Sequence, residues 1–157
     1  FGSMTDNKKE QLFSLILKVV EKLDIKVLVS KGWMELGKNN LSEKIKVIGD
    51  VPHSILFPLL TGVIHHGGAG TTAISVSSGV PQLIIPYLLD QHYWGYQVYK
   101  MGLGPKPIKR SKVTITNLSN SIIEMINNKK YSNIAKEISI LLKEEDSMAN
   151  LVNKIIK

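Results

Sequence analysis

A glycine-rich turn between a short apolar run and a run of small residues is the part of this sequence best suited to chemistry. The segment reads Val63-Ile64-His65-His66-Gly67-Gly68-Ala69-Gly70-Thr71-Thr72. The first turn of a helix has unpaired N–H groups and a partial positive charge, and small residues let an anion approach that backbone closely. The segment therefore predicts a phosphate site, held by several hydrogen bonds of roughly 1.5–3 kcal/mol each.

The predicted phosphate donors lie on both sides of the start of this helix. They are the backbone or side chains of Gly68, Ala69, Gly70, Thr71 and Thr72. His66 stands where the apolar run ends, so its imidazole can donate to a phosphate oxygen. Tight packing of a strand against a helix requires fewer small residues than three glycines and two threonines. We therefore favour a ligand over a purely structural turn.

A dinucleotide site is a second interpretation of the same turn. The run from Gly68 to Ala73 fits the pattern G-x-G-x-x-G/A, and Asp90 follows about 20 residues later, where a ribose-binding acid belongs. That pattern usually follows the first strand of its domain, whereas two expected strands precede it here. A P-loop is excluded because no lysine follows the glycines. Binding of NAD stays open as the alternative.

We expect no metal site. Adjacent side chains on a strand point to opposite faces, so His65 and His66 do not readily share one ion. The sequence contains no Asp-x-Asp pair to hold a divalent cation against a diphosphate, and it has no cysteine. The lack of cysteine also excludes disulfides and thiolate nucleophiles and favours an intracellular protein.

The elements that would position these residues alternate along the chain. Strands are expected at 25–30, 44–48, 62–65, 82–87 and 104–108. Helices are expected at 8–22, 54–60, 71–78, 90–101, 116–126, 131–142 and 147–156. This alternation predicts an α/β fold, with a parallel sheet covered by helices on both faces. We expect one domain over residues 1–157, of which 110–157 form a mainly helical tail.

The composition excludes several other classes of protein. The 157 residues carry a net charge of +7, with a basic cluster between Lys106 and Lys112. Most of this charge is typical of a solvated surface, so we expect no nucleic-acid partner, although the charge permits peripheral membrane association. No run approaches the ~20 apolar residues of a membrane span. The opening residues, Phe1 to Met4, suggest a chain cut from a longer protein.

Several motifs together resemble the signature of the UDP-glycosyltransferases. These motifs are His66 to Thr72, Gly79-Val80-Pro81, Pro86-Tyr87, Asp90-Gln91 with Trp94-Gly95, and Gly102-Leu103-Gly104-Pro105. The likeness extends to about Ile123 and is greatest to the sterol 3-β-glucosyltransferase branch. It implies the C-terminal, donor-binding half of a GT-B fold, in which two Rossmann-like domains enclose the active site. An N-terminal acceptor domain would then be absent from this chain.

The resemblance also assigns roles to individual residues. His66 and the backbone from Gly68 to Thr72 would hold the diphosphate, and Ser3 would reach the same phosphates. The backbone of Val51 would recognise uracil, with Trp33 or His53 near the base or ribose. Asp90 and Gln91 would bond the sugar hydroxyls. Plant members of the superfamily carry a ribose-binding acid at the position of Ile74 and a uracil-stacking tryptophan at that of Asp50, and the sterol branch shares both differences.

The implied activity is inverting, metal-independent transfer of glucose from UDP-glucose to the hydroxyl of a sterol or similar lipid. His66 would stabilise the charge on the departing UDP, whereas the catalytic base would lie in the missing domain, which would leave the isolated domain inactive. UDP-glucose is the donor and no cofactor is expected. The resemblance implies a cytoplasmic enzyme. The alternatives are an NAD-type oxidoreductase domain and a non-catalytic nucleotide-binding or interaction subunit.

Overall fold

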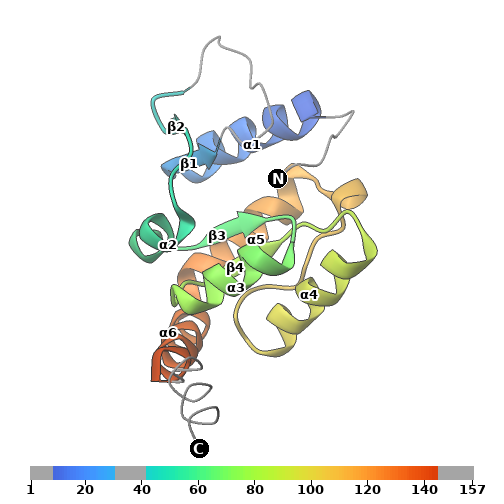
Figure 1. The fold of residues 1–157 in the computed structure, drawn as a ribbon. Helices are drawn as coiled ribbons and strands as arrows, with labels where there is room; N and C mark the ends of the chain where they lie inside the picture. Colours follow the sequence, from blue (N-terminus) through green and yellow to red (C-terminus); the bar gives the residue numbers. More distant parts are fainter. Residues whose placement is uncertain (1–8, 31–41, 145–157) are drawn as a thin grey trace, which may run out of the picture.

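A computed structural model describes residues 9–30 and 42–144 of the chain (Figure 1). The helices are α1 (Lys9–Leu23), α2 (His53–Leu56), α3 (Ala69–Ser77), α4 (Leu89–Lys100), α5 (Ile115–Asn127) and α6 (Lys129–Glu144), with short 3-10 turns η1 (Phe57–Leu59) and η2 (Arg110–Lys112). The strands are β1 (Val27–Ser30), β2 (Ile45–Ile48), β3 (Val63–His65) and β4 (Gln82–Ile84). The expected order of helices and strands is confirmed over these ranges, except for the strand expected at 104–108. The helix expected at 147–156 lies outside them.

The described strands pair in parallel. β1 pairs with β2, from Val27 opposite Ile45 to Ser30 opposite Ile48. β3 pairs with β4, from Val63 opposite Gln82 to His65 opposite Ile84. Within the described ranges the backbone hydrogen bonds form two separate two-stranded sheets, and not the one continuous sheet that the sequence predicts. Side chains of β1, β2 and β3 line a cavity between the two pairs.

Strand β4 is covered by helices on both faces, which confirms the expected layering. Leu83 and Ile85 pack with Val19 of α1 and with Leu118, Ile122 and Met125 of α5. Ile84 points to the other face, where it packs with Val98 of α4 and Ala135 of α6. A strand buried on both faces requires a continuous apolar run, which Leu83 to Ile85 provides. This core fixes the end of β4 next to the start of α4.

The expected strand at 104–108 is wrong. The segment lies beside β4 as an irregular chain, tied by bonds from Gln82 N to Leu103 O (2.9 Å) and from Ile108 N to Ile84 O (3.0 Å). Pro105 and Pro107 have no N–H to donate, so the ladder of a regular strand cannot be completed. The segment still closes the open edge of β4.

Nowhere in the described ranges is a helix both long and apolar enough to cross a bilayer.

Candidate functional site

The predicted phosphate turn joins β3 to α3. β3 ends at His65, and the first helical residue is Ala69, with Gly68 as an extended N-cap (φ −63°, ψ 140°). No side chain caps this helix. The first bond of the helix runs from Thr72 N to Gly68 O (2.9 Å), so the N–H groups ahead of Thr72 have no carbonyl within the helix. Ala69 and Gly70 are exposed. The turn therefore presents free backbone donors to solvent, as predicted.

The two threonines of the turn have different surroundings. Thr71 is half-buried and lines the cavity described below. Thr72 is buried, and its hydroxyl donates to Gly68 O (2.9 Å). Ser75 donates in the same way to Thr71 O (2.8 Å). Thr71 is thus the threonine that faces the cavity. A direct phosphate contact by Thr72 stays a prediction, because its hydroxyl hydrogen is directed to the backbone.

The imidazole of His66 lies across the turn. A Cβ atom placed on Gly68 would lie 2.6 Å from His66 Nε2, so the ring occupies the space that a side chain would fill. Partial burial lowers the pKa of His66 below 6.5, and the nearby carboxylate of Asp90 opposes this shift. At pH 7 the imidazole is therefore neutral and has one N–H to donate. Its position and protonation state fit a hydrogen bond to phosphate.

Gly67 fixes the turn against the start of α4. Its φ of +92° lies in the left-handed region, which glycine adopts without strain. A Cβ atom there would lie 2.7 Å from Ile84 Cγ2 and 3.0 Å from Gln91 O. The close approach brings the first turn of α4 beside the glycine turn, at the carboxyl ends of β3 and β4.

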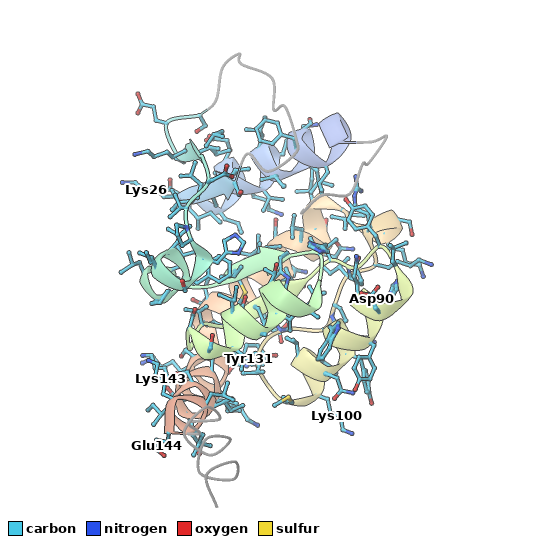
Figure 2. All side chains as sticks on the ribbon, viewed as in Figure 1. Lys26, Asp90, Lys100, Tyr131, Lys143 and Glu144 are labelled. Carbon is cyan, nitrogen blue, oxygen red and sulfur yellow. The ribbon has the colours of Figure 1, made fainter. Side chains whose placement is uncertain are left out.

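Asp90 and Gln91 occupy different environments at this end of the molecule. Asp90 is exposed, on the side toward which β3 points (Figure 2). Gln91 is only 4% exposed. Its Oε1 accepts hydrogen bonds from Tyr87 N (2.8 Å) and Leu88 N (3.2 Å), which caps α4. The sequence predicts that both residues bond sugar hydroxyls. In the structure the Asp90 carboxylate is accessible to a ligand, whereas the amide oxygen of Gln91 is bonded to backbone N–H groups of the same chain.

Four of the predicted site residues share one cavity of about 590 Å³, a size typical of ligand pockets. They are Val51, His53, His66 and Thr71. The cavity lies at the carboxyl ends of β1, β2 and β3, where ligands bind in open α/β folds. His53 stacks on buried Phe57, with ring centroids 4.5 Å apart at an angle of 14°. Asp90 and Gln91 do not line this cavity, and Ser3 and Trp33 lie outside the described residues.

The cavity lining includes two polar residues at strand ends that the sequence analysis did not predict as site residues. Ser30 is the last residue of β1, and Asp50 follows β2 by two residues. Both lie at the carboxyl ends of expected strands. Because ligands in open α/β folds bind at these ends, this position could have identified both residues from the sequence. Ile74, the position at which the resemblance offers no ribose-binding acid, packs against the core cluster of Phe57, Val63 and Val80. The structure thus offers Asp50 as a carboxylate that lines the cavity.

His65 has a structural role. It is buried, its Nδ1 accepts from Gly67 N (3.1 Å), and its Nε2 lies 2.8 Å from Gln82 Oε1. The proton is therefore on Nε2. Burial lowers the pKa of His65 to about 4, although the bond to Gln82 opposes the shift. The neutral ring joins the glycine turn to β4. No group of three or more metal-ligating side chains occurs within the described ranges.

Acid should destabilise the fold through His65. The unfolded imidazole takes up a proton near pH 6.5, whereas the buried one does so only near pH 4. The stabilisation is complete above pH 6.5 and is lost as the pH falls towards 4, by about 3 kcal/mol in total. Urea unfolding at several pH values measures this slope. His65→Gln should flatten this dependence of stability on pH. An unchanged slope in His65→Gln would contradict the assignment of the effect to His65.

Gly68→Ala should displace His66 without unfolding the chain. The new methyl would meet the tip of the imidazole, which can rotate away, and the φ of −63° at Gly68 suits alanine. The prediction that His66 holds a diphosphate implies that this variant binds UDP roughly tenfold more weakly, as measured by calorimetry. Because both substitutions act on one ring, Gly68→Ala and His66→Ala should be less than additive. Additive losses would show that the methyl acts elsewhere.

Residues 14–156 match the family described as erythromycin biosynthesis protein CIII-like, C-terminal domain. The chain belongs to this family. The match covers nearly the whole chain, including the glycine turn, the start of α4 and the cavity.

Curated relatives of this family member include plant and yeast enzymes. A sterol 3-beta-glucosyltransferase of Arabidopsis thaliana is 37% identical over 155 residues, which are 98% of this chain and 25% of that protein. A second from the same plant is 34% identical over 160 residues, 100% of this chain and 25% of that protein. One from Komagataella phaffii is 32% identical over 95% of the chain and 13% of its own length. The chain thus spans about a quarter of the Arabidopsis relatives. The expected resemblance is confirmed.

Solved structures confirm the fold. The glycotransferase of kitacinnamycin superimposes with a TM-score of 0.84 at 21% identity, over 98% of this chain and 41% of that one. Spinosyn forosaminyltransferase superimposes with a TM-score of 0.81 at 18% identity, over 99% of this chain and 42% of that one. The family member therefore has the α/β fold of one half of a GT-B glycosyltransferase.

Proposed function

We propose that the chain is the donor-binding domain of a glycosyltransferase that moves glucose from UDP-glucose to a sterol or similar lipid. The observation that carries this proposal is the position of His66, whose neutral imidazole lies over an uncapped helix start and lines a cavity of about 590 Å³. The names of the similar plant and yeast proteins support the choice of glucose and of a sterol acceptor.

The arrangement suits the nucleotide end of the donor. The diphosphate would meet the backbone N–H groups that begin α3, together with His66 and Thr71. The base and ribose would enter the cavity towards Val51 and His53, past the carboxylate of Asp50. A carboxylate can accept from both hydroxyls of a ribose. The sugar would lie towards exposed Asp90.

Chemistry in this site would be electrostatic. As the sugar–phosphate bond breaks, negative charge grows on the β-phosphate, and donors aimed at that oxygen stabilise the transition state more than the ground state. His66 and the start of α3 can supply such donors. A base must also deprotonate the acceptor hydroxyl. Among the described residues close to Asp90 in the chain, the one imidazole is that of His92 on α4, and it is half-buried. We therefore assign the base that deprotonates the acceptor to the rest of the protein, and expect this chain alone to bind the donor without transferring glucose.

We propose that donor binding requires no metal ion or cofactor. The sequence has no Asp-x-Asp pair to bridge a cation to a diphosphate, and the partial charge of the helix start can take the place of a cation. Binding of UDP should therefore be unchanged when a chelator is present during the titration. A strong dependence of affinity on added Mg²⁺ would contradict this part of the proposal.

The dinucleotide alternative is less well supported by the fold. In that pattern the ribose acid follows the second strand of the unit, but β4 ends at Ile84 and Asp90 lies inside the first turn of α4. The acid is thus displaced from the strand end. The second alternative, a nucleotide-binding subunit without catalytic activity, would bind UDP in the same way. A transferase assay that includes the acceptor domain distinguishes such a subunit from an enzyme.

The lipid acceptor suggests where the protein acts. We propose a cytoplasmic protein in peripheral contact with membranes, because sterols reside in bilayers while nucleotide sugars are dissolved in water.

The decisive experiment is calorimetric titration of the 157-residue chain with UDP-glucose, UDP-galactose, UDP-GlcNAc and NAD, each with a chelator. We expect UDP-glucose to bind more tightly than the other sugars and NAD not to bind. Tighter binding of NAD than of any UDP-sugar would refute the proposal, and a preference for another UDP-sugar would correct the donor.

A further inference from the structure

Helix α4 carries a row of exposed tyrosines on its outer surface. Tyr93, Tyr96 and Tyr99 are 57%, 56% and 44% exposed. They are spaced three residues apart, so they lie on adjoining parts of one helix face, and exposed Lys100 lies on the same side. These four residues form what we call the tyrosine face. Lys100 lies at the end of α4 opposite to Asp90 (Figure 2).

The fold does not need this face. The inner side of α4 supplies its contacts with the core through Val98, which is 2% exposed, and through Gly95, where a Cβ would lie 3.0 Å from Pro107 Cβ. On the outer side only Tyr93 has a ring partner among the described residues, an edge contact with Trp94 at 5.3 Å. Three large aromatic side chains on the solvent side of a helix are more than stability requires, which indicates a partner that contacts them.

The chemistry of the tyrosine face fits a bilayer surface. Tyrosine has an apolar ring and a polar tip, and it concentrates at the boundary between hydrocarbon and water. Lysine can place its stem on the apolar layer and its ammonium group among the headgroups. The three phenols and the ammonium group point to an interfacial environment.

The segment that contains α4 and the chain after it is basic, which favours an anionic bilayer. After α4 the chain returns along the inner side of the helix, where Pro107 lies beside Gly95, to the end of β4, where Arg110 N bonds to Pro86 O (3.1 Å). The segment 88–113, which contains α4 and the chain that follows it, carries five basic side chains and a single carboxylate, Asp90. That carboxylate lies at the far end of α4 from Lys100 (Figure 2). The basic residues are Lys100, Lys106, Lys109, Arg110 and Lys112. A basic surface is attracted to anionic headgroups over about a Debye length even without direct contact.

We infer that the tyrosine face binds the surface of an anionic lipid bilayer. Tyr93, Tyr96 and Tyr99 enter the headgroup layer, and Lys100 with the basic segment after it supplies the electrostatic attraction. The twelve residues of α4 span about 18 Å, so a bilayer contacted by the tyrosine face lies close to the exposed carboxylate of Asp90. This inference deepens the proposed membrane contact but does not depend on which nucleotide the cavity binds.

Flotation of the 157-residue chain with lipid vesicles tests the inference. One set contains phosphatidylcholine alone, and the other adds about 30% phosphatidylserine, within the range of anionic cytoplasmic leaflets. We expect binding to the second set that falls with added salt, and much weaker binding to the first. The triple variant Tyr93→Gln/Tyr96→Gln/Tyr99→Gln should bind roughly tenfold more weakly, and Lys100→Gln about fivefold. Glutamine is a good helix former, so α4 should persist.

The matched control is Ile140→Gln/Leu141→Gln on α6, where the replaced side chains are 55% and 58% exposed. These substitutions remove exposed apolar surface elsewhere and should leave vesicle binding unchanged. Circular dichroism and UDP titration of each variant should match the parent, which separates this test from failure of the proposed function.

Three results would overturn the inference: no binding to either vesicle, full binding by the triple variant, or an equal loss in the α6 control. If vesicles do not bind but the chain sediments as a dimer that the triple variant breaks, the tyrosine face belongs to a second copy of the chain.

Discussion

UDP should bind the His66→Ala variant roughly 10- to 150-fold more weakly than the parent chain, which corresponds to the 1.5–3 kcal/mol of a hydrogen bond to a charged group. The imidazole lies over Gly68, and its neutral state leaves one N–H for a phosphate oxygen. The substitution removes that donor from the mouth of the cavity. Calorimetry with UDP measures the loss without requiring an acceptor or a second domain.

The control for this prediction is His92→Ala. His92 is also a half-buried histidine, but it lies on α4 and does not line the cavity. Its removal should leave the affinity for UDP unchanged. His66→Gln should keep part of the affinity, because an amide N–H can replace the imidazole donor. An unaltered affinity in folded His66→Ala would remove His66 from the site and with it the main support for the proposed function.

Gly104→Ala should lower the free energy of unfolding by roughly 3 kcal/mol or more, since it places a methyl group inside a packed core. The added Cβ would lie 1.9 Å from the carbonyl oxygen of Gln82 and 2.9 Å from its carbonyl carbon. These are backbone atoms of buried β4, so no side chain can rotate away. The chain after α4 must move off β4, and the bond from Gln82 N to Leu103 O (2.9 Å) would be lost.

Thermal unfolding measures this effect. A chain of this length loses about 2–4 °C of Tm for each kcal/mol, so a drop of about 6–12 °C is expected. Gly49→Ala is the matched control, because no atom lies within 4 Å of the Cβ it would add. A Tm for Gly104→Ala within a degree or two of the parent would mean that the segment after α4 does not pack as described.

Much of the local structure could be predicted from the sequence because it rests on short-range physics. Apolar runs and helical periodicity predict the described strands and helices to within a few residues at most ends. The glycine turn with its following threonines predicts the uncapped start of α3. The 104–108 segment was predicted wrongly because its apolar pattern resembles a strand, while the missing N–H groups of Pro105 and Pro107 prevent a ladder.

Local patterns in the sequence predict the glycine turn, the alternation of helices and strands and the resemblance to glycosyltransferases, because each depends on neighbouring residues. Tertiary structure alone decided that Thr72 and Gln91 turn their polar atoms to the backbone while Thr71 faces the cavity. It also brought Ser30 and Asp50 to the same cavity as His66. The physical reason is that burial and hydrogen-bond partners depend on residues far apart in the chain, which parallel strands bring together at one edge.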